Sequence, residues 1–259
     1  MKFSYKEYGD QDAPFIVFLH GGGVSSWMWE HQVRHFTNYH CVTVDLPEQG
    51  KSTQCGPFSI ENSADQISEF IHKLANGKDV IVVGFSLGAQ VLIQILSESP
   101  NLIHYAMINS ALVKPNKLGG KLINPLLRLT YPLIQNRTFA KLQAKTLFID
   151  EHHFETYYNE SSQMERETLA RILKENMSFH IPSGFEKAKA NILVTVGAKE
   201  KSVMKKSAVD IVNSNDHCTG VIISEAGHGA PLSHPKLFNE MIEKWIDGEE
   251  LPRNCEIIE

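Results

Sequence analysis

The sequence has few cysteines, and their spacing is typical neither of a metal site nor of a disulfide-rich fold. None of the four cysteines in the 259 residues forms a C-x-x-C pair; they are Cys41, Cys55, Cys218 and Cys255. This usage argues against a zinc module and against a small disulfide scaffold. The simplest prediction is a cytoplasmic enzyme with reduced thiols and no bound metal.

The chain also lacks long apolar runs and a concentrated basic face. Its longest apolar runs, such as Phe15–Leu19 and Val80–Val83, are too short to span a bilayer. The first ten residues are polar and contain no apolar signal core. The formal net charge is −5, and acidic residues dilute the short basic clusters. We therefore expect neither a membrane nor a nucleic acid as partner.

What remains is an ordinary globular composition, with 42% hydrophobic and 21% charged residues. Apolar, β-branched runs alternate with stretches of helical periodicity. This alternation predicts an α/β fold, in which helices cover both faces of a mostly parallel twisted sheet. The expected strands are Phe15–Leu19, Cys41–Asp45, Val80–Val83, Tyr105–Asn109, Ile192–Val196 and Gly220–Ile223, with Met1–Tyr8 as an antiparallel edge strand.

The predicted helices follow the 3.6-residue period and end at recognisable signals. One apolar stripe runs from Ala64 to Leu74, and Asn76-Gly77 after it favours a left-handed cap. A second helix over Ala89–Leu96 stops before Pro100, and a last one contains Phe238, Ile242 and Trp245.

One segment breaks the alternation. Residues 114–185 contain no clear strand and are too long for a plain crossover loop. We predict a helical cap insertion at 114–185 within a core domain formed by 1–113 and 186–259. Such an insertion at the carboxyl end of a parallel sheet lies where these folds bind ligands. Its aromatic residues suit the interior of the cap better than ligand contacts, so no substrate-binding residue is assigned.

The strongest chemical signal is Gly84-Phe85-Ser86-Leu87-Gly88, between a predicted strand and a predicted helix. In this strand–turn–helix context, the G-x-S-x-G pattern is a nucleophile elbow. The flanking glycines let strand and helix approach closely, and the tight turn exposes the serine hydroxyl. Ser86 is the candidate nucleophile.

A glycine run, His20-Gly21-Gly22-Gly23, follows the first buried strand. Glycines there leave backbone N–H groups free to point at a substrate oxygen. Together with the N–H of Leu87, one of them would form an oxyanion hole. Gly22 is the preferred donor and Gly23 the next. We interpret His20 as a structural residue.

His228 lies between small residues in Ala226-Gly227-His228-Gly229, after the last predicted parallel strand. This position fits the chain order of nucleophile, acid and histidine, so His228 is the candidate general base.

Glu200 follows the strand Ile192–Val196 and is the candidate acid. It would accept the Nδ1–H of the histidine and stabilise the imidazolium. The preceding strand ends in Asn109-Ser110, which has no carboxylate, and Glu225 is a poor orienting partner.

These motifs resemble the α/β-hydrolase superfamily over most of the chain. The resemblance includes Asp45-Leu46-Pro47, which is similar to a segment of esterase-like members. It departs at Glu48 and Gln49, where glycine and histidine are usual, and at Glu200, where aspartate is commoner. The resemblance implies a helical cap over the pocket.

The predicted function is a serine hydrolase that cleaves a carboxylic ester of a small or medium substrate through a Ser–His–acid triad. Members with aspartate at the elbow, such as haloalkane dehalogenases and epoxide hydrolases, are disfavoured by Ser86. Thioesterase, lactonase, C–C bond hydrolase and cofactor-free haloperoxidase activities stay open, as does a non-enzymatic ligand receptor on the same fold. No cofactor is expected. The sequence leaves the substrate and the oligomeric state open.

Overall fold

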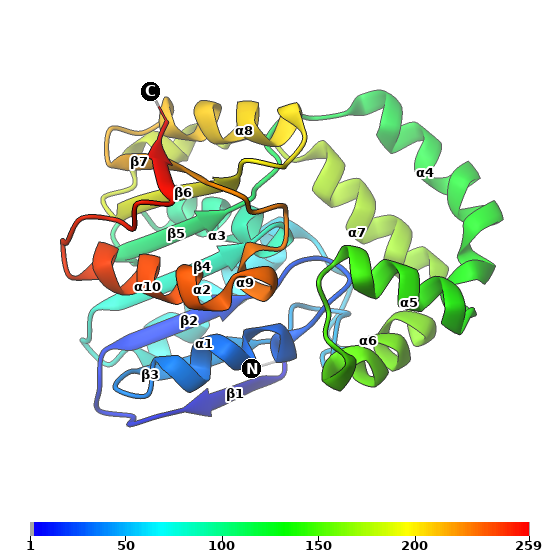
Figure 1. Ribbon diagram of the computed structural model, residues 1–259, viewed down its shortest axis with the longest axis horizontal. Helices are drawn as coiled ribbons and strands as arrows, with labels where there is room; N and C mark the ends of the chain where they lie inside the picture. Colours follow the sequence, from blue (N-terminus) through cyan, green and yellow to red (C-terminus); the bar gives the residue numbers. More distant parts are fainter. Residues whose placement is uncertain (1–2, 259) are drawn as a thin grey trace.

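A computed structural model describes residues 3–258, and its centre is one eight-stranded sheet (Figure 1). The strand order is β1-β3-β2-β4-β5-β6-β7-β8. The six inner strands are mutually parallel, and β1 and β8 pair antiparallel at the two edges. The strands are β1 Tyr5–Tyr8, β2 Phe15–Leu19, β3 His40–Val44, β4 Val80–Phe85, β5 Tyr105–Asn109, β6 Asn191–Gly197, β7 Cys218–Ile223 and β8 Cys255–Ile257.

The predicted fold class is confirmed, and the six predicted inner strands are found with small shifts at their ends. The predicted edge strand Met1–Tyr8 is found as the antiparallel β1, which begins only at Tyr5, so Phe3 and Ser4 were wrongly included; Met1 and Lys2 lie outside the described residues. β8 was not predicted, because a three-residue strand near the C-terminus has no alternation to reveal it.

Helices cover both faces of the sheet because its inner strands alternate between two buried clusters. In β2, Val17 faces the cluster that α2, α3 and α8 complete, and Phe18 faces the cluster of α1 and α10. The helices of this core are η1 Ser26–Trp29, α1 Glu30–His35, α2 Ile60–Leu74, α3 Leu87–Glu98, α8 Ser202–Val212, α9 Ala230–Ser233 and α10 Pro235–Ile246.

The predicted end of α2 is also found. Asn76 and Gly77 have φ values of 47° and 81°, the left-handed conformation expected after this helix. At its start, Ser59 Oγ accepts the backbone N–H of Asn62 at 3.1 Å.

Residues 114–185, between β5 and β6, are helical where they are regular, as expected. They form α4 Lys117–Thr130, η2 Tyr131–Gln135, α5 Arg137–Thr146, α6 Glu151–Gln163, α7 Arg166–Ser178 and the first part of η3 Ser183–Lys187. Figure 1 shows α4 to α7 beside the sheet as a group of their own. At the end of the segment, Phe179 and Phe185 pack into the core of the sheet. We call α4 to α7 the inserted helices; their role as a cap and the division into domains stay predictions.

Among residues 3–258, none of the helices has the length and apolar character needed to cross a lipid bilayer.

Candidate active site

Ser86 lies at the sharp turn between β4 and α3. Its φ of 52° and ψ of −108° are strained for a residue with a side chain. The neighbouring glycines make the turn possible: a Cβ on Gly84 would lie 2.7 Å from the carbonyl oxygen of Gly88. A Cβ on Gly88 would lie 2.6 Å from the carbonyl oxygen of His20. The structure thus has the strand–turn–helix geometry that the motif predicts.

Three side chains that are far apart in the sequence meet beside this turn. His228 Nε2 lies 3.1 Å from Ser86 Oγ, and His228 Nδ1 lies 2.8 Å from Glu200 Oε2. Since a carboxylate can only accept, Nδ1 carries the proton and Nε2 is left to accept the serine hydroxyl. The three residues that the sequence selected are therefore in hydrogen-bonding contact, in the order that a serine hydrolase uses.

Glu200 is held firmly behind the histidine. Its side chain is only 1% exposed, and Oε1 accepts the backbone N–H of Gly197 at 2.8 Å and the hydroxyl of Ser110 at 2.7 Å. Burial alone would raise the pKa of Glu200. The hydrogen bond and charge of His228, with those two donors, outweigh burial and lower the pKa below its ordinary value. Glu200 is thus kept charged opposite the histidine.

Ser110 is a site residue that the sequence reasoning missed. It follows β5, where an acid was sought and not found, and it supports the acid that follows β6 instead. Its φ of 56° turns the chain at the strand end. The available signal was a small hydroxyl residue directly after β5. Its neighbour in the sheet, β6, is followed by the acid Glu200.

The glycine loop after β2 lies against the start of α3. A Cβ on Gly22 would lie 3.5 Å from the side chain of Leu87, and Gly23 has a left-handed φ of 80°. Among the described residues, the backbone N–H groups of Gly22, Gly23 and Leu87 make no hydrogen bond. These three N–H groups are available donors, and their role as an oxyanion hole stays a prediction.

Buried His20 fixes this loop. Its Nε2 accepts the N–H of Leu46 at 2.9 Å, and its Nδ1 lies 2.7 Å from the carbonyl oxygen of Gly21. The ring is therefore neutral with the proton on Nδ1, and burial lowers its pKa accordingly. His20 connects the loop after β2 to the loop after β3, a structural arrangement.

Asp45 organises the second of these loops. Its carboxylate accepts the N–H of Ser26 at 2.8 Å and the N–H of Lys51 at 2.9 Å. Gly50, with a φ of 54°, packs so closely that a Cβ there would lie 2.6 Å from Asp45 Cγ. The chain after β3 is thereby positioned next to η1.

The inserted helices contact the core through polar pairs as well as through buried apolar side chains. Glu48, in a position where the family usually has glycine, accepts two hydrogen bonds from Arg171 of α7, at 2.6 Å and 2.9 Å. Glu160 of α6 accepts the hydroxyl of Ser25 and the indole N–H of Trp27, each at 3.0 Å. The departure at Glu48 thus forms a contact between the sheet and α7.

Phe148, after α5, lies against the loop that carries the candidate base. A Cβ on Gly229 would lie 3.0 Å from the Phe148 ring, and one on Gly227 would lie 3.9 Å from it. The Phe85 ring packs against the His228 ring itself, at a centroid distance of 5.2 Å. The glycines on both sides of His228 leave room for the Phe148 ring.

A cavity of about 200 Å³ lies between the glycine loop and the inserted helices. Gly22 and Gly23 form one wall, and α5, α6 and α7 contribute to the other. The cavity therefore meets the candidate site at the proposed oxyanion donors.

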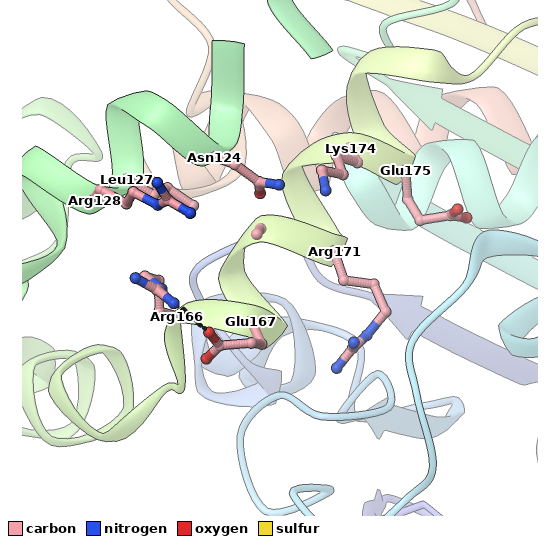
Figure 2. A pocket seen from close by; sticks show the side chains of 9 residues that line it. Asn124, Leu127, Arg128, Arg166, Glu167, Arg171, Lys174 and Glu175 are labelled. Carbon is pink, nitrogen blue, oxygen red and sulfur yellow. Dashed lines mark hydrogen bonds and ion pairs between the residues drawn. The ribbon is translucent and has the colours of Figure 1, made fainter. Parts of the chain in front are cut away.

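A larger groove of about 460 Å³ lies between α4 and α7 (Figure 2). Figure 2 shows Arg166 paired with Glu167 in this groove, with Arg171 pointing away from them. Its lining includes none of the site residues; it consists of Asn124, Leu127, Arg128, Arg166, Glu167, Ala170, Arg171, Lys174 and Glu175. This groove is separate from the candidate site.

One group of side chains has the composition of a metal site. Ligand atoms of Glu30, His152 and His153 lie within 4.8 Å of one another. Both ring nitrogens of His153 are already paired, with Glu30 at 2.7 Å and with Asp150 at 2.8 Å. The histidine is satisfied by carboxylates, and we assign no metal there.

Comparisons with known proteins identify the family of the chain. The model of the alpha/beta hydrolase family matches residues 16–241. An Acinetobacter baylyi protein named (E)-2-((N-methylformamido)methylene)succinate hydrolase is 21% identical, over 94% of this chain and 93% of its own.

Two solved structures show the same fold. A bromoperoxidase from Bacillus anthracis has a TM-score of 0.78 at 17% identity, and an esterase from Exiguobacterium antarcticum has a TM-score of 0.77 at 19% identity. Each comparison covers 95% of both chains. With most of its length matched by the family model, the chain belongs to the alpha/beta hydrolase family.

Proposed function

We propose that the protein is a serine hydrolase that cleaves a carboxylic ester of a small or medium substrate. The observation that carries this proposal is the hydrogen-bonded series of Ser86, His228 and Glu200 beside the elbow. Nucleophile, base and orienting acid are within the reach that acyl transfer requires, without any cofactor.

In the first half of the reaction, His228 Nε2 takes the proton of Ser86 as Oγ attacks the ester carbonyl carbon. The carbonyl oxygen becomes an oxyanion and receives hydrogen bonds from the N–H groups of Leu87 and Gly22. Glu200 stabilises the imidazolium from the Nδ1 side. As the tetrahedral intermediate collapses, the C–O bond to the alcohol breaks and His228 gives its proton to the departing oxygen.

In the second half, water attacks the acyl-enzyme. His228 takes one proton of the water, and the new oxyanion occupies the same donors. Ser86 Oγ then leaves and recovers its proton from His228, so the enzyme is regenerated and a carboxylic acid is released.

Relatives and structural neighbours support hydrolysis as the general reaction and leave the bond type to experiment. The relative from Acinetobacter baylyi is named a hydrolase, and one solved neighbour is an esterase. A thioester, a lactone or an activated C–C bond could be attacked by the same serine, and a bromoperoxidase shares the fold.

The test is covalent labelling with a fluorophosphonate, combined with turnover of p-nitrophenyl acetate. We expect the wild-type protein to be labelled at Ser86 and to release p-nitrophenol. Ser86→Ala should lose both properties. Ser99→Ala, at the other end of α3, should keep both, because Ser99 is remote from His228.

Label on another residue, or on Ser86→Ala as strongly as on wild type, would overturn the proposal. A folded wild-type protein with neither label nor turnover of esters, thioesters or lactones would point to a ligand receptor instead.

A further inference from the structure

We propose that α4 binds the surface of an anionic lipid bilayer, with its exposed leucines among the lipid chains and its cations against the headgroups. Three observations carry this proposal: a row of leucines in solvent, a long stretch of chain that has basic and no acidic residues, and exposed cations without partners. Binding of this kind decides where the protein is held and does not depend on which bond it cleaves.

One face of α4 is apolar and exposed to solvent. Leu122, Leu126 and Leu129 are 63%, 58% and 80% exposed. Their spacing of four and three residues places them on one face of the helix. The face toward the protein is a different one, on which Ile123 and Leu127 pack against residues of α7. The helix α4 therefore has two apolar faces, and the protein buries only one of them.

The exposed apolar surface continues beyond α4. In the next turn, η2, Leu133 is 42% exposed. Figure 1 shows α4 along the outer side of the inserted helices. We call Leu122, Leu126, Leu129 and Leu133 the leucine row. Neighbouring exposed apolar side chains are uncommon on a soluble protein and mark a surface that binds something.

The leucine row lies in a stretch of chain with charges of one sign. Residues 114–149 contain seven lysines and arginines and no aspartate or glutamate, whereas the whole chain has a net charge of −5. Lys121 and Arg128 directly precede Leu122 and Leu129, so they lie beside the leucine row. Both cations are exposed, and neither is paired with a carboxylate among the described residues. An apolar face beside cations is typical of a helix that lies in a membrane interface.

The groove between α4 and α7 adds a further cation to this surface. Lys174 is exposed and lines the groove together with Arg128 (Figure 2). The two carboxylates of the groove are already engaged: Glu167 accepts from Arg166, and Glu175 accepts the first backbone N–H of α2. Arg128 and Lys174 are therefore left to meet an anion from outside the chain.

The negative net charge of the chain does not prevent such binding. At physiological ionic strength, charges are screened over about 8 Å, so a lipid surface at α4 meets mainly the cations of this region. Our expectation of no membrane partner was based on the net charge and on the lack of a long apolar run. A helix that lies flat on a bilayer requires no such run, because it does not cross the bilayer.

A second copy of the chain suits this surface less well. A two-fold dimer would place the leucine row against itself, and with it Lys121 and Arg128 of both copies. These like charges would repel one another. The phosphate and carboxylate groups of anionic lipids would instead neutralise them.

The experiment is co-sedimentation of the wild-type protein with unilamellar vesicles. Two compositions are compared at low salt: phosphatidylcholine alone, and equal parts of phosphatidylcholine and phosphatidylserine. We expect the partition coefficient to be at least about tenfold higher for the anionic vesicles, because each lysine or arginine near such a surface strengthens binding several-fold. Added sodium chloride should weaken the binding.

Leu129→Gln replaces the most exposed leucine with a polar residue that also suits a helix. Binding to the anionic vesicles should fall by about fivefold or more, since a leucine side chain is no longer transferred into the lipid. Ile257→Gln is the matched control: Ile257 is 61% exposed and lies in β8, outside the inserted helices. This variant should bind as the wild type does.

Lys121→Gln combined with Arg128→Gln removes two cations beside the leucine row. Binding to the anionic vesicles should fall by at least about tenfold, and any weak binding to the neutral vesicles should not change. Lys236→Gln combined with Arg253→Gln removes the same charge from exposed positions outside the inserted helices and should bind as the wild type does. Circular dichroism checks that all variants are folded, and their turnover of p-nitrophenyl acetate should match that of the wild type.

Several results would overturn the proposal. The wild-type protein could fail to bind the anionic vesicles, or it could bind both compositions equally. Unchanged binding in folded Leu129→Gln or in the folded Lys121 and Arg128 double variant would have the same meaning. If the wild type bound no vesicles and sedimented as a dimer that Leu129→Gln dissociates, the leucine row would be a subunit interface instead. None of these results depends on ester hydrolysis, so the proposed function is tested separately.

Discussion

The carboxyl edge of the sheet and the inserted helices are built in different ways. At the edge of the sheet, the side chains of Ser86, His228 and Glu200 each have a defined hydrogen-bond partner, and Glu200 has three. In the inserted helices, large apolar side chains are left in solvent: Leu122, Leu126, Leu129, Leu133 and Leu142 are 42–80% exposed. The helices α4 and α7 share only a small buried cluster, around Ile123, Leu127 and Ala170.

This difference separates two tasks. Chemistry requires atoms held to within a fraction of an ångström, and the ends of packed strands provide that precision. Substrate choice requires a surface that can vary without unfolding the protein, and we expect the inserted helices, which join the sheet through polar pairs and some buried apolar side chains, to provide it. Substitutions at the edge of the sheet should therefore change rates, and those in the inserted helices should change stability or preference.

Ser86→Ala has the largest expected effect. Without this hydroxyl, the elbow has no nucleophile to attack the ester carbonyl carbon. We expect kcat for p-nitrophenyl acetate to fall by a factor on the order of 10⁶, with unchanged circular dichroism. A variant that kept more than a tenth of wild-type turnover would show that the chemistry takes place elsewhere in the molecule.

Glu200→Gln should have the next largest effect. Oε1 of residue 200 must accept hydrogen bonds from Gly197 and Ser110, so the new amide NH₂ will face His228 Nδ1. The ring then carries its proton on Nε2 and cannot accept the proton of Ser86. We expect a loss of about 10³–10⁴ in kcat, similar to the corresponding change in trypsin.

Glu200→Asp, which keeps the charge and shortens the side chain, is the matched control and should lose less activity. The two variants are compared by kcat on one activated ester. Equal losses in both variants would mean that the side-chain length of residue 200 matters, and that its charge and its effect on the His228 tautomer do not.

The sheet and the three central site residues could be predicted from the sequence because their signals are local. A buried β-branched run followed by Gly-x-Ser-x-Gly specifies a strand, a turn and a helix together. Glu200 and His228 could be selected because each directly follows such a run. The carboxyl ends of parallel strands meet at one edge of the sheet. The position of Glu200 and His228 in the chain was therefore enough to place them near Ser86.

Contacts between distant segments could not be predicted in this way. Nothing local to Glu48 indicates that it will meet Arg171 in α7, 123 residues later. The side chain of Gln49 is buried without a hydrogen-bond partner among the described residues, which is a property of the folded interior, and the sequence shows only that the residue is unusual for the family. Ser110 was set aside because an acid was sought at its position.

Glu48→Gln tests the contact between the two regions through its pH dependence. Burial raises the pKa of Glu48, but hydrogen bonds from Arg171, Phe58 and Thr168 and the charge of Arg171 outweigh burial and lower it. A lowered pKa in the folded state stabilises the protein above the ordinary pKa of 4.5, and this contribution is lost as pH falls through the folded-state pKa.

We therefore expect Glu48→Gln to reduce the free energy of unfolding by about 1–2 kcal/mol at pH 7, as is usual for a charge-assisted hydrogen bond at a partly exposed site. The difference from wild type should shrink below pH 4.5. Urea unfolding at several pH values measures it. Glu167→Gln, whose ion pair with Arg166 is exposed, is the control and should show no measurable difference. If the loss of unfolding free energy in Glu48→Gln did not depend on pH, the effect would come from packing and not from the charge of Glu48.

Gly120→Ala should have the smallest effect, and it should stabilise the protein. Gly120 lies within α4, its φ is not positive, and an added Cβ would have no heavy atom within 4 Å. Alanine in such a position restricts the unfolded chain and suits the helix, which is worth about 0.5–1 kcal/mol. Gly119→Ala is the adjacent control: its Cβ would overlap Met177 Cε and lie 2.8 Å from Nδ2 of Asn116, whose Oδ1 caps the helix. Urea unfolding of both variants should therefore give opposite signs. A loss of stability in Gly120→Ala would mean that this face of α4 is packed against something in solution, and that the inserted helices are less open than the comparison with the sheet implies.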